Sequence, residues 1–323
     1  MFRNMNARNF GLKSRDMVKA ATNAYREHES SYGSIDTYTS HFRQFAGWLH
    51  SETGIKDMRW IQKGDVVAYA ENLANRVEKG ELDNDTAHNH VSAINVALSQ
   101  ARSDKQVHIS ASQYLPPRNY IATESRAATE ETTRETIALI GTHSLGERLE
   151  AMIDLQRLLG LRFEESAKAN PSILLREAIS KGRVTIVDGT KGGRAREVPI
   201  TSDKQLTALE RAAKIQGCHH SMIPKELSYF QFQTAGYRAI QDCPIKGFHD
   251  FRNTYAHMRY VNLVGVPCPV AIGVGHGKPH HQYIADQLGT TFSKAKEIDH
   301  DARKNIAEEL GHARLRITNS YLG

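Results

Sequence analysis

Cysteine is scarce in this sequence of 323 residues, which contains only Cys218, Cys243 and Cys268. An odd number without Cys-x-x-Cys spacing excludes a disulfide framework and a zinc site made of four thiolates. Long apolar runs are absent too, because no stretch reaches the roughly 18 residues that a membrane-spanning helix needs. The first residues also lack the apolar stretch of a secretory signal. We therefore expect reduced thiols, no membrane association and a cytoplasmic location.

A strong charge imbalance is lacking as well. The 42 lysines and arginines stand against 36 aspartates and glutamates, for a net charge of +6 at pH 7. With 40% hydrophobic residues the composition is typical of a folded protein, and the length predicts two domains. The net charge permits binding to a polyanion without requiring it. Basic residues concentrate in residues 1–20, for which we weigh DNA contact and a frayed, solvated terminus as equal alternatives.

Helical periodicity runs through residues 21–112. Apolar side chains recur three and four positions apart in residues 34–49, and similar stripes follow in residues 66–73 and 87–98. These stripes predict a bundle of about four short helices. We expect the aromatic residues of the first stripe to pack in the core rather than to stack on bases. The pattern ends at a Pro-Pro pair within residues 113–125, which predicts an interdomain linker.

Residues 126–323 are predicted to form a mixed but mostly helical domain. Two stretches with strand character, 183–187 and 195–200, flank a glycine-rich turn. This pattern predicts one β-hairpin, so the fold class is mainly α with a small β-hairpin. Helices are predicted at residues 130–140, 149–159, 202–214, 228–240, 249–262 and 301–310.

Two candidates for chemistry lie in the first half of this domain. Arg162 alone is typical of a surface or capping residue, but Glu165, three positions later, can hold its guanidinium on a helix face. Lys191 stands in the hairpin turn beside Gly192 and Gly193. Glycine lets the backbone approach a bulky anion, although the turn matches neither a phosphate-binding loop nor a dinucleotide fingerprint. By itself, the turn is most simply a solvated hairpin tip.

Two further candidates lie in the second half. His249 and Arg252 are three apart on a predicted helix, so both side chains project from one face and can address one anion. Near the end of the chain, the pair Gly311-His312 is followed nine residues later by Tyr321. Each of these patterns arises by chance in many proteins, and a tyrosine in that position is ordinarily a packing residue.

Taken together and in this order, the four pieces resemble the tyrosine recombinases, the phage-type integrase family. The resemblance covers most of the chain, with residues 21–112 as a helical core-binding domain and residues 126–323 as the catalytic domain. It implies a site-specific recombinase of a mobile genetic element that cleaves and rejoins double-stranded DNA through a 3′-phosphotyrosyl intermediate. The residues that match the family's catalytic motifs are Arg162, Lys191, His249, Arg252, His312 and Tyr321, with Glu165 orienting Arg162.

The implied chemistry accounts for these residue types. The two arginines bind the non-bridging oxygens and stabilise the charge on a pentacoordinate phosphorus, in the place of a metal ion. Tyr321 attacks the phosphorus, and the covalent link conserves the bond energy for rejoining, so that no cofactor is needed. His249 is the candidate base, Lys191 the acid for the 5′-oxygen and His312 a hydrogen-bond donor to the phosphate.

The chain departs from the family pattern between its two histidine motifs. His249 and His312 are 63 residues apart, which is longer than usual, so residues 262–300 are an expected insertion. The insertion has a Gly-His pair of its own at His276, but nine residues later stands Ala285 instead of a tyrosine. We therefore assign the motif to His312.

Histidines are frequent in the insertion and also follow Cys218, but their spacing matches no known zinc pattern. We expect a solvated loop in the insertion and no metal site. A second departure is that two residues follow Tyr321, whereas many members of the family continue into a helix that docks on a neighbouring subunit. The way in which subunits exchange their tails is left open.

Two other functions share part of this pattern. A type IB topoisomerase uses the same arginine, lysine, histidine and tyrosine chemistry, and a DNA-binding regulatory factor could retain the fold without catalysis. The helical N-terminal domain favours recombination over the first, and the full set of catalytic residue types argues against the second. As partners we expect double-stranded DNA, three further subunits in a tetramer on paired sites, and accessory DNA-bending or directionality proteins, with the protein associated with the nucleoid.

Overall fold

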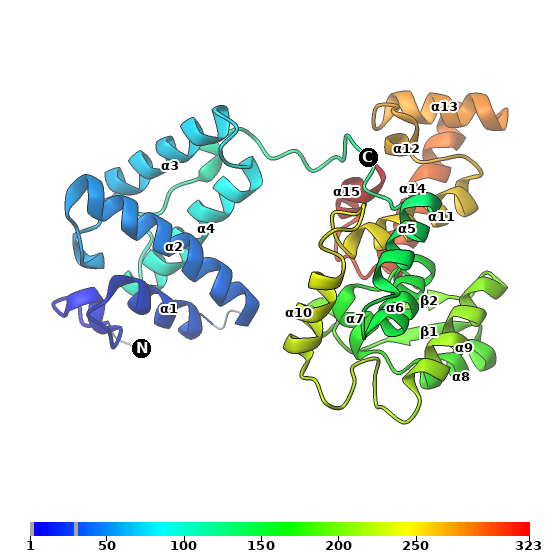
Figure 1. Cartoon of the computed structure of the whole chain (residues 1–323). Coiled ribbons are helices and arrows are strands. Elements are labelled where there is room, and N and C mark those ends of the chain that lie inside the picture. The colour runs from blue at the N-terminus through cyan, green and yellow to red at the C-terminus, as the bar shows by residue number, and fades with distance from the viewer. Residues whose placement is uncertain (1–2, 29–31) are drawn as a thin grey trace. The chain divides into compact units, whose positions relative to one another are not determined.

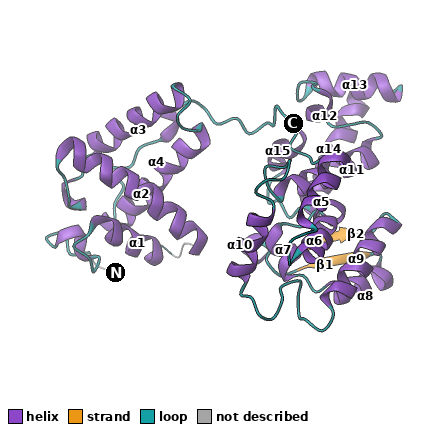
Figure 2. Cartoon of the chain, in the orientation of Figure 1, coloured by secondary structure: helices purple, strands orange, loops and turns teal. Residues whose placement is uncertain are grey.

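The computed structural model describes residues 3–28 and 32–323. It divides into two compact units, Met1–Asn119 and Tyr120–Gly323 (Figure 1). The division falls inside residues 113–125, the segment in which a linker is expected. Helices predominate in both units, and the described strands lie in the second unit alone (Figure 2). Among the described residues, no helix is long and apolar enough to cross a membrane.

The described residues of the N-terminal unit form a bundle of four α-helices. Aspartate side chains cap two of them, since Asp16 accepts from the backbone of Lys19 and Asp83 from that of Thr86. The aromatic stripe of the second helix packs inward as expected, with two of its phenylalanines fully buried. The elements are η1 (Arg8–Gly11), α1 (Met17–Glu27), α2 (Tyr32–Thr53), η2 (Met58–Trp60), α3 (Lys63–Glu78), α4 (Asn84–Arg102) and η3 (Ala111–Gln113).

The described part of the basic N-terminal arm is folded. Phe10 and Leu12 are 3% and 1% exposed, and α1 already begins at Met17. Of the two alternatives for the arm, a frayed, solvated terminus does not hold for Phe10 and Leu12, because these apolar side chains join the core of the helical bundle. Residues 1–2 of the arm lie outside the described residues. DNA contact by its charged side chains stays a prediction.

The C-terminal unit surrounds one two-stranded antiparallel sheet with helices. The strands pair in a register that sets Arg183 opposite Pro199 and Ile186 opposite Arg196. The elements are α5 (Glu130–Ile140), α6 (Gly146–Leu159), α7 (Phe163–Lys168), α8 (Pro171–Lys181), β1 (Arg183–Ile186), η4 (Lys191–Gly193), β2 (Arg196–Pro199), α9 (Asp203–Gln216), α10 (Tyr229–Ala239), α11 (His249–Val264), α12 (Pro269–Ile272), α13 (Lys278–Leu288), α14 (Phe292–Glu309), η5 (Leu315–Thr318) and α15 (Asn319–Leu322).

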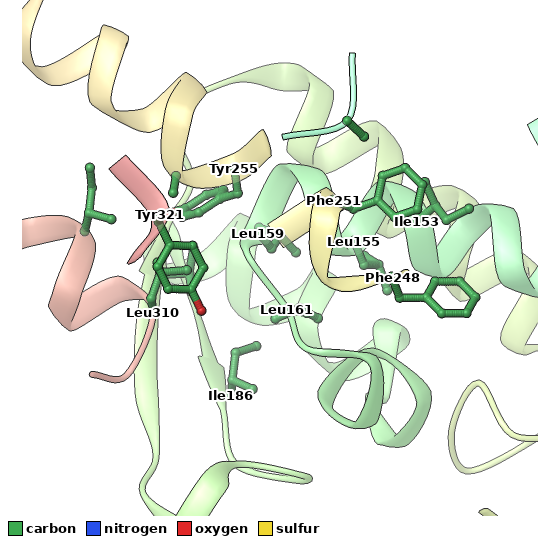
Figure 3. Packing of buried hydrophobic residues seen from close by; sticks show 14 of the residues in the cluster. Ile153, Leu155, Leu159, Leu161, Ile186, Phe248, Phe251, Tyr255, Leu310 and Tyr321 are labelled. Atoms are coloured by element: carbon green, nitrogen blue, oxygen red, sulfur yellow. The ribbon is translucent and has the colours of Figure 1, made fainter. Parts of the chain in front are cut away.

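Helices α6 and α11 form the centre of this unit. Figure 3 shows Leu155 and Leu159 of α6 beside Phe251 and Tyr255 of α11, all of them buried. Tyr321 joins the same cluster from the end of the chain. The core therefore extends to the residue expected to carry the chemistry.

The expected insertion is helical and packed. Residues 262–300 contain α12, α13 and the first half of α14, which are drawn in orange tones at one end of the unit in Figure 1. His280 is fully buried with Nε2 3.0 Å from the carbonyl oxygen of Pro267, and Ile284 and Ala295 are buried too. The expectation of a solvated loop is wrong, because these apolar residues bury one face of α13 and α14 against the core.

Candidate active site

The site is built where α6 ends and α7 begins. Gly160 has a φ of +63°, the left-handed conformation that glycine adopts without strain. A Cβ atom at this position would lie 2.6 Å from Cδ1 of Tyr255. Glycine thus lets the chain pass close against α11 before Arg162 starts the next helix, and it leaves the Gly160 carbonyl oxygen available to α11.

The two predicted arginines meet around backbone carbonyl groups. Arg252, on the first turn of α11 and fully buried, donates to the carbonyl oxygens of Gly160 and Leu310. Nη2 of Arg162 lies 3.4 Å from the same Leu310 oxygen. Burial, with the charges of Arg162 and Arg196, lowers the pKa of Arg252 to about 10, so the guanidinium remains charged at neutral pH. The structure therefore places two positive charges side by side.

Glu165 is the anion that balances these charges. Its Oε1 lies 2.5 Å from Nη1 of Arg162, and its Oε2 accepts from the Arg162 backbone N–H at 2.7 Å, which caps α7. Oε2 also lies 2.7 Å from Nη2 of Arg196 and 3.5 Å from Nη1 of Arg252. Burial raises the pKa of Glu165, but Arg196 and Arg252 outweigh it and the pKa is lowered. Glu165 remains a carboxylate shared by three arginines.

Arg196 is the member of this cluster that no sequence motif indicated. It is 5% exposed and donates to the carbonyl oxygens of Glu309 and Gly160, the latter at 3.1 Å. Its position on β2 contained the signal, since side chains alternate along a strand and Arg196 shares the inward face with the buried Val198. An arginine on the buried face of a strand requires a buried anion.

Tyr321 reaches the cluster from α15. Its hydroxyl oxygen lies 3.4 Å from Nε of Arg252, and its side chain is 7% exposed. The Tyr321 carbonyl oxygen lies 2.8 Å from Nε2 of His257 on α11. In Figure 3 the ring stands beside Leu310 with its hydroxyl directed away from Tyr255. The phenolic oxygen is thus adjacent to a guanidinium, while the ring packs in the core.

Two histidines flank the tyrosine ring. The ring centroids of His249 and His312 lie 5.4 Å and 5.1 Å from that of Tyr321. Burial and the neighbouring charges of Arg252 lower the pKa of His249 to about 4 and that of His312 to about 3. Both imidazoles are therefore neutral at pH 7. Nδ1 of His312 is buried and has no hydrogen-bond partner among the described residues.

Lys191 stands apart from this cluster. It begins η4 at the tip of the hairpin, is exposed, and forms no hydrogen bond or ion pair within residues 3–28 and 32–323. Beside the turn end of the hairpin, an open depression of about 650 Å³ is lined by Arg194, Arg196 and His312 among others. Lys191 is followed in the turn by Gly192 and Gly193, which both have a positive φ. Because glycine restricts the backbone least, Lys191 lies in a segment with few conformational restraints.

The alternative histidine motif does not take part in the cluster. Nδ1 of His276 lies 2.9 Å from the carbonyl oxygen of Gly323, the residue that follows the tyrosine-bearing helix. For the described part of the chain, no group of three histidine, cysteine, aspartate or glutamate side chains is placed to hold a metal ion. The residues brought together are thus Arg162, Glu165, Arg252, His249, His312 and Tyr321, with Arg196 added and Lys191 outside.

Comparison with known proteins finds one matching family and several similar folds. Residues 120–258 match the model of a family described as integrase. Among solved structures, the chain is similar to the Tn1549 transposon integrase in complex with transposon right end DNA, with 10% identity, 94% of this chain and 95% of that chain covered, and a TM-score of 0.57. It is also similar to the lambda integrase tetramer bound to a Holliday junction, with 14% identity, 87% and 76% covered, and a TM-score of 0.52.

At these identities the structural likeness establishes the fold, which spans both units of the chain. A search of the curated proteins finds no match to this sequence.

Proposed function

We propose that this chain is a site-specific DNA recombinase of the tyrosine recombinase family, in line with the match of residues 120–258 to a family described as integrase, and we assign a role to each residue of its site. Tyr321 is the nucleophile that attacks a backbone phosphorus of duplex DNA. The phenolic proton passes to His249, the new bond joins the Tyr321 oxygen to the 3′-phosphate, and the 5′-oxygen leaves with a proton from Lys191. Attack by a 5′-hydroxyl of a second DNA end reverses the step and releases the tyrosine.

The arginines stabilise the charge that develops on the non-bridging oxygens. A guanidinium carries five N–H donors, and two carbonyl oxygens and the Tyr321 hydroxyl engage three of those on Arg252. Glu165 lies 3.5 Å from Nη1, so the second N–H of Nη2 is the donor left for a phosphate oxygen. Arg162 is less buried than Arg252 and is held by Glu165, so it can present its fork from a fixed position.

In this scheme one neutral histidine accepts a proton and the other donates a hydrogen bond. A base must accept a proton at neutral pH, and the low pKa of His249 leaves its ring neutral and free to do so. A neutral imidazole also retains one N–H, with which His312 donates a hydrogen bond to the phosphate.

The observation that carries the proposal is the position of the Tyr321 hydroxyl, 3.4 Å from Arg252 and flanked by two histidine rings. A DNA-binding factor without catalysis has no use for this arrangement. A type IB topoisomerase would share it, but the integrase match favours recombination.

The partners follow from this function. We propose that the protein acts on duplex DNA as a tetramer on paired sites, in line with the tetramer that lambda integrase forms on a Holliday junction. Accessory DNA-bending or directionality proteins would then control which reaction occurs, and the DNA substrate would place the protein at the nucleoid.

The test is a covalent trap. A duplex selected from a random-sequence pool by its binding to the protein is nicked beside the cleavage position, so that the cleaved fragment diffuses away. We expect a denaturant-resistant protein–DNA adduct, formed equally well in the presence of EDTA. If the protein binds the selected duplexes tightly and forms no adduct on any nicked version, it is a regulatory factor and the proposal is wrong.

A further inference from the structure

One buried arginine binds both ends of the helix that carries Tyr321. Arg303, on α14, is 4% exposed. Its Nη1 donates to the side-chain oxygen of Asn319 at 3.0 Å, and its Nη2 donates to the carbonyl oxygen of Gly323 at 2.9 Å. Asn319 begins α15 and Gly323 follows its last residue. A single guanidinium therefore fixes the short segment on both sides of the tyrosine.

Arg303 is itself held in place by Asp299, one turn earlier on α14. Nε of Arg303 lies 3.0 Å from both carboxylate oxygens of Asp299. The carboxylate also accepts from the hydroxyl of Tyr260 on α11 and lies 3.2 Å from Nε2 of His281 on α13. Two further titratable groups face it, namely His280, with Nδ1 3.9 Å away, and the buried thiol of Cys268. Asp299 thus ties three helices to the guanidinium.

The same helices hold the segment by further contacts. His276, just before α13, lies 2.9 Å from the Gly323 carbonyl oxygen. Gly323 has a φ of +82°, and a Cβ atom there would lie 2.9 Å from the backbone nitrogen of Val270 on α12. Of these anchors, Asp299, His276 and Val270 belong to residues 262–300, the segment that lengthens the chain between its two histidine motifs.

We propose that Arg303, oriented by Asp299, is a positioning residue that holds α15 so that the Tyr321 hydroxyl stays against Arg252. The inference rests on the proposed function, because it assigns a purpose to the placement of the nucleophile. The guanidinium of Arg303 is buried and its hydrogen bonds go to Asp299, Asn319 and Gly323, so it holds the segment rather than the phosphate. The helices α12 to α14 are thereby assigned to the alignment of the tyrosine rather than to DNA contact.

An arginine is needed for this task. Its planar fork presents donors in three directions, so it can bind Asp299, Asn319 and Gly323 at the same time. A lysine keeps the positive charge, but all its donors are on one nitrogen atom, so it cannot reach all three acceptors at once. Misplacement of a reacting group by about 1 Å is enough to slow a reaction by about 100-fold.

The test compares Arg303→Lys with Lys304→Arg, which makes the reverse exchange at the exposed neighbouring position. Asn319→Ala removes one acceptor and leaves the buried ion pair in place. Three quantities are measured on the full chain: the single-turnover rate of adduct formation on the nicked duplex, the dissociation constant for that duplex, and the amide hydrogen exchange of residues 315–323.

We expect Arg303→Lys to form adduct about 100-fold more slowly, with an unchanged dissociation constant and faster exchange confined to residues 315–323. Asn319→Ala should change the rate and the exchange in the same direction by less, and Lys304→Arg should behave as wild type. The inference is overturned if Asn319→Ala and Arg303→Lys keep the wild-type rate and exchange. It is also overturned if exchange rises throughout the C-terminal unit and DNA binding weakens in both variants, since that result indicates a general structural role.

Failure of the proposed function gives a different result. In that case the wild-type chain forms no adduct at all, whereas the exchange of residues 315–323 still reports whether Arg303 anchors the segment.

Discussion

At the scale of single residues, the site depends on one carboxylate among three guanidinium groups. Glu165 is 1% exposed and contacts Arg162, Arg196 and Arg252. Like charges this close repel one another strongly in a buried site, so the arginines can assemble only around the anion. The cost of removing that anion should therefore appear in stability before it appears in chemistry.

Glu165→Gln keeps the shape of the side chain and removes its charge. We expect the free energy of unfolding to fall by about 3 kcal/mol or more, as when one partner of a buried ion pair is lost. Denaturant unfolding measures this directly. Glu164→Gln is the matched control, because its partner Lys168 lies in a partly exposed pair on the same short helix. Equal stability of the two variants would show that Glu165 does not hold the cluster.

The histidines predict the pH dependence of cleavage. The folded pKa of His249, about 4, lies below its ordinary value of 6.5, so the neutral, proton-accepting form predominates until the pH falls close to 4. The single-turnover rate on saturating DNA should accordingly stay flat as the pH is lowered from about 8 to about 5. A rate that is already halved near pH 6.5 would mean that His249 titrates as an exposed histidine and is not the buried base.

At the scale of elements, the β-hairpin carries Lys191, the proposed catalytic residue that no contact in the described structure holds in the site. Lys191 is exposed at the tip, and among the described residues nothing holds it near Tyr321. If the hairpin delivers a general acid, Lys191→Ala should cleave ordinary DNA slowly and recover on a duplex whose 5′-bridging oxygen is replaced by sulfur, because a thiolate leaves without a proton. Normal rates on both substrates would make Lys191 a surface residue. Slow rates on both would make it a phosphate ligand.

The elements also show what periodicity predicts and what it misses. The hairpin and the helices at residues 130–140 and 249–262 were predicted close to their observed bounds, because their patterns are continuous. Residues 262–300 were not, since glycines and prolines separate the shorter helices α12 and α13, and the buried face of α14 consists largely of alanine and charged residues. Arg303 was missed for a related reason, because only the folded chain brings α14 to the end of α15.

At the scale of the whole molecule, the proposed catalytic residues all belong to one of the two units. Residues 120–323 contain every proposed catalytic residue, and residues 3–119 contain none. The order of motifs along the chain predicted which residues the fold brings together near Gly160, with the exception of Lys191. The Glu165–Arg196 pair was not predictable in this way, since its two partners come from elements that only the tertiary fold brings together.

The basic arm offers a test of how the N-terminal unit contributes to DNA binding. Because Phe10 and Leu12 are in the core, deleting residues 1–20 would unfold the unit, and the charge should be removed instead. Exchange of the exposed Lys13, Arg15 and Lys19 for glutamine should flatten the salt dependence of DNA affinity by about 0.9 for each phosphate that is no longer neutralised. The unfolding midpoint serves as the control. An unchanged slope would show that the arm does not bind DNA.

The most direct test of the account is to identify the residue that becomes bonded to DNA. The trapped adduct is digested with a protease, and the peptide that remains on the 3′-phosphate is sequenced by mass spectrometry. We predict that the DNA is attached to Tyr321, and that Tyr321→Phe binds the same duplex with unchanged affinity and forms no adduct, since only the phenolic oxygen is removed. Attachment to any other residue, or an adduct that persists in Tyr321→Phe, would contradict the account.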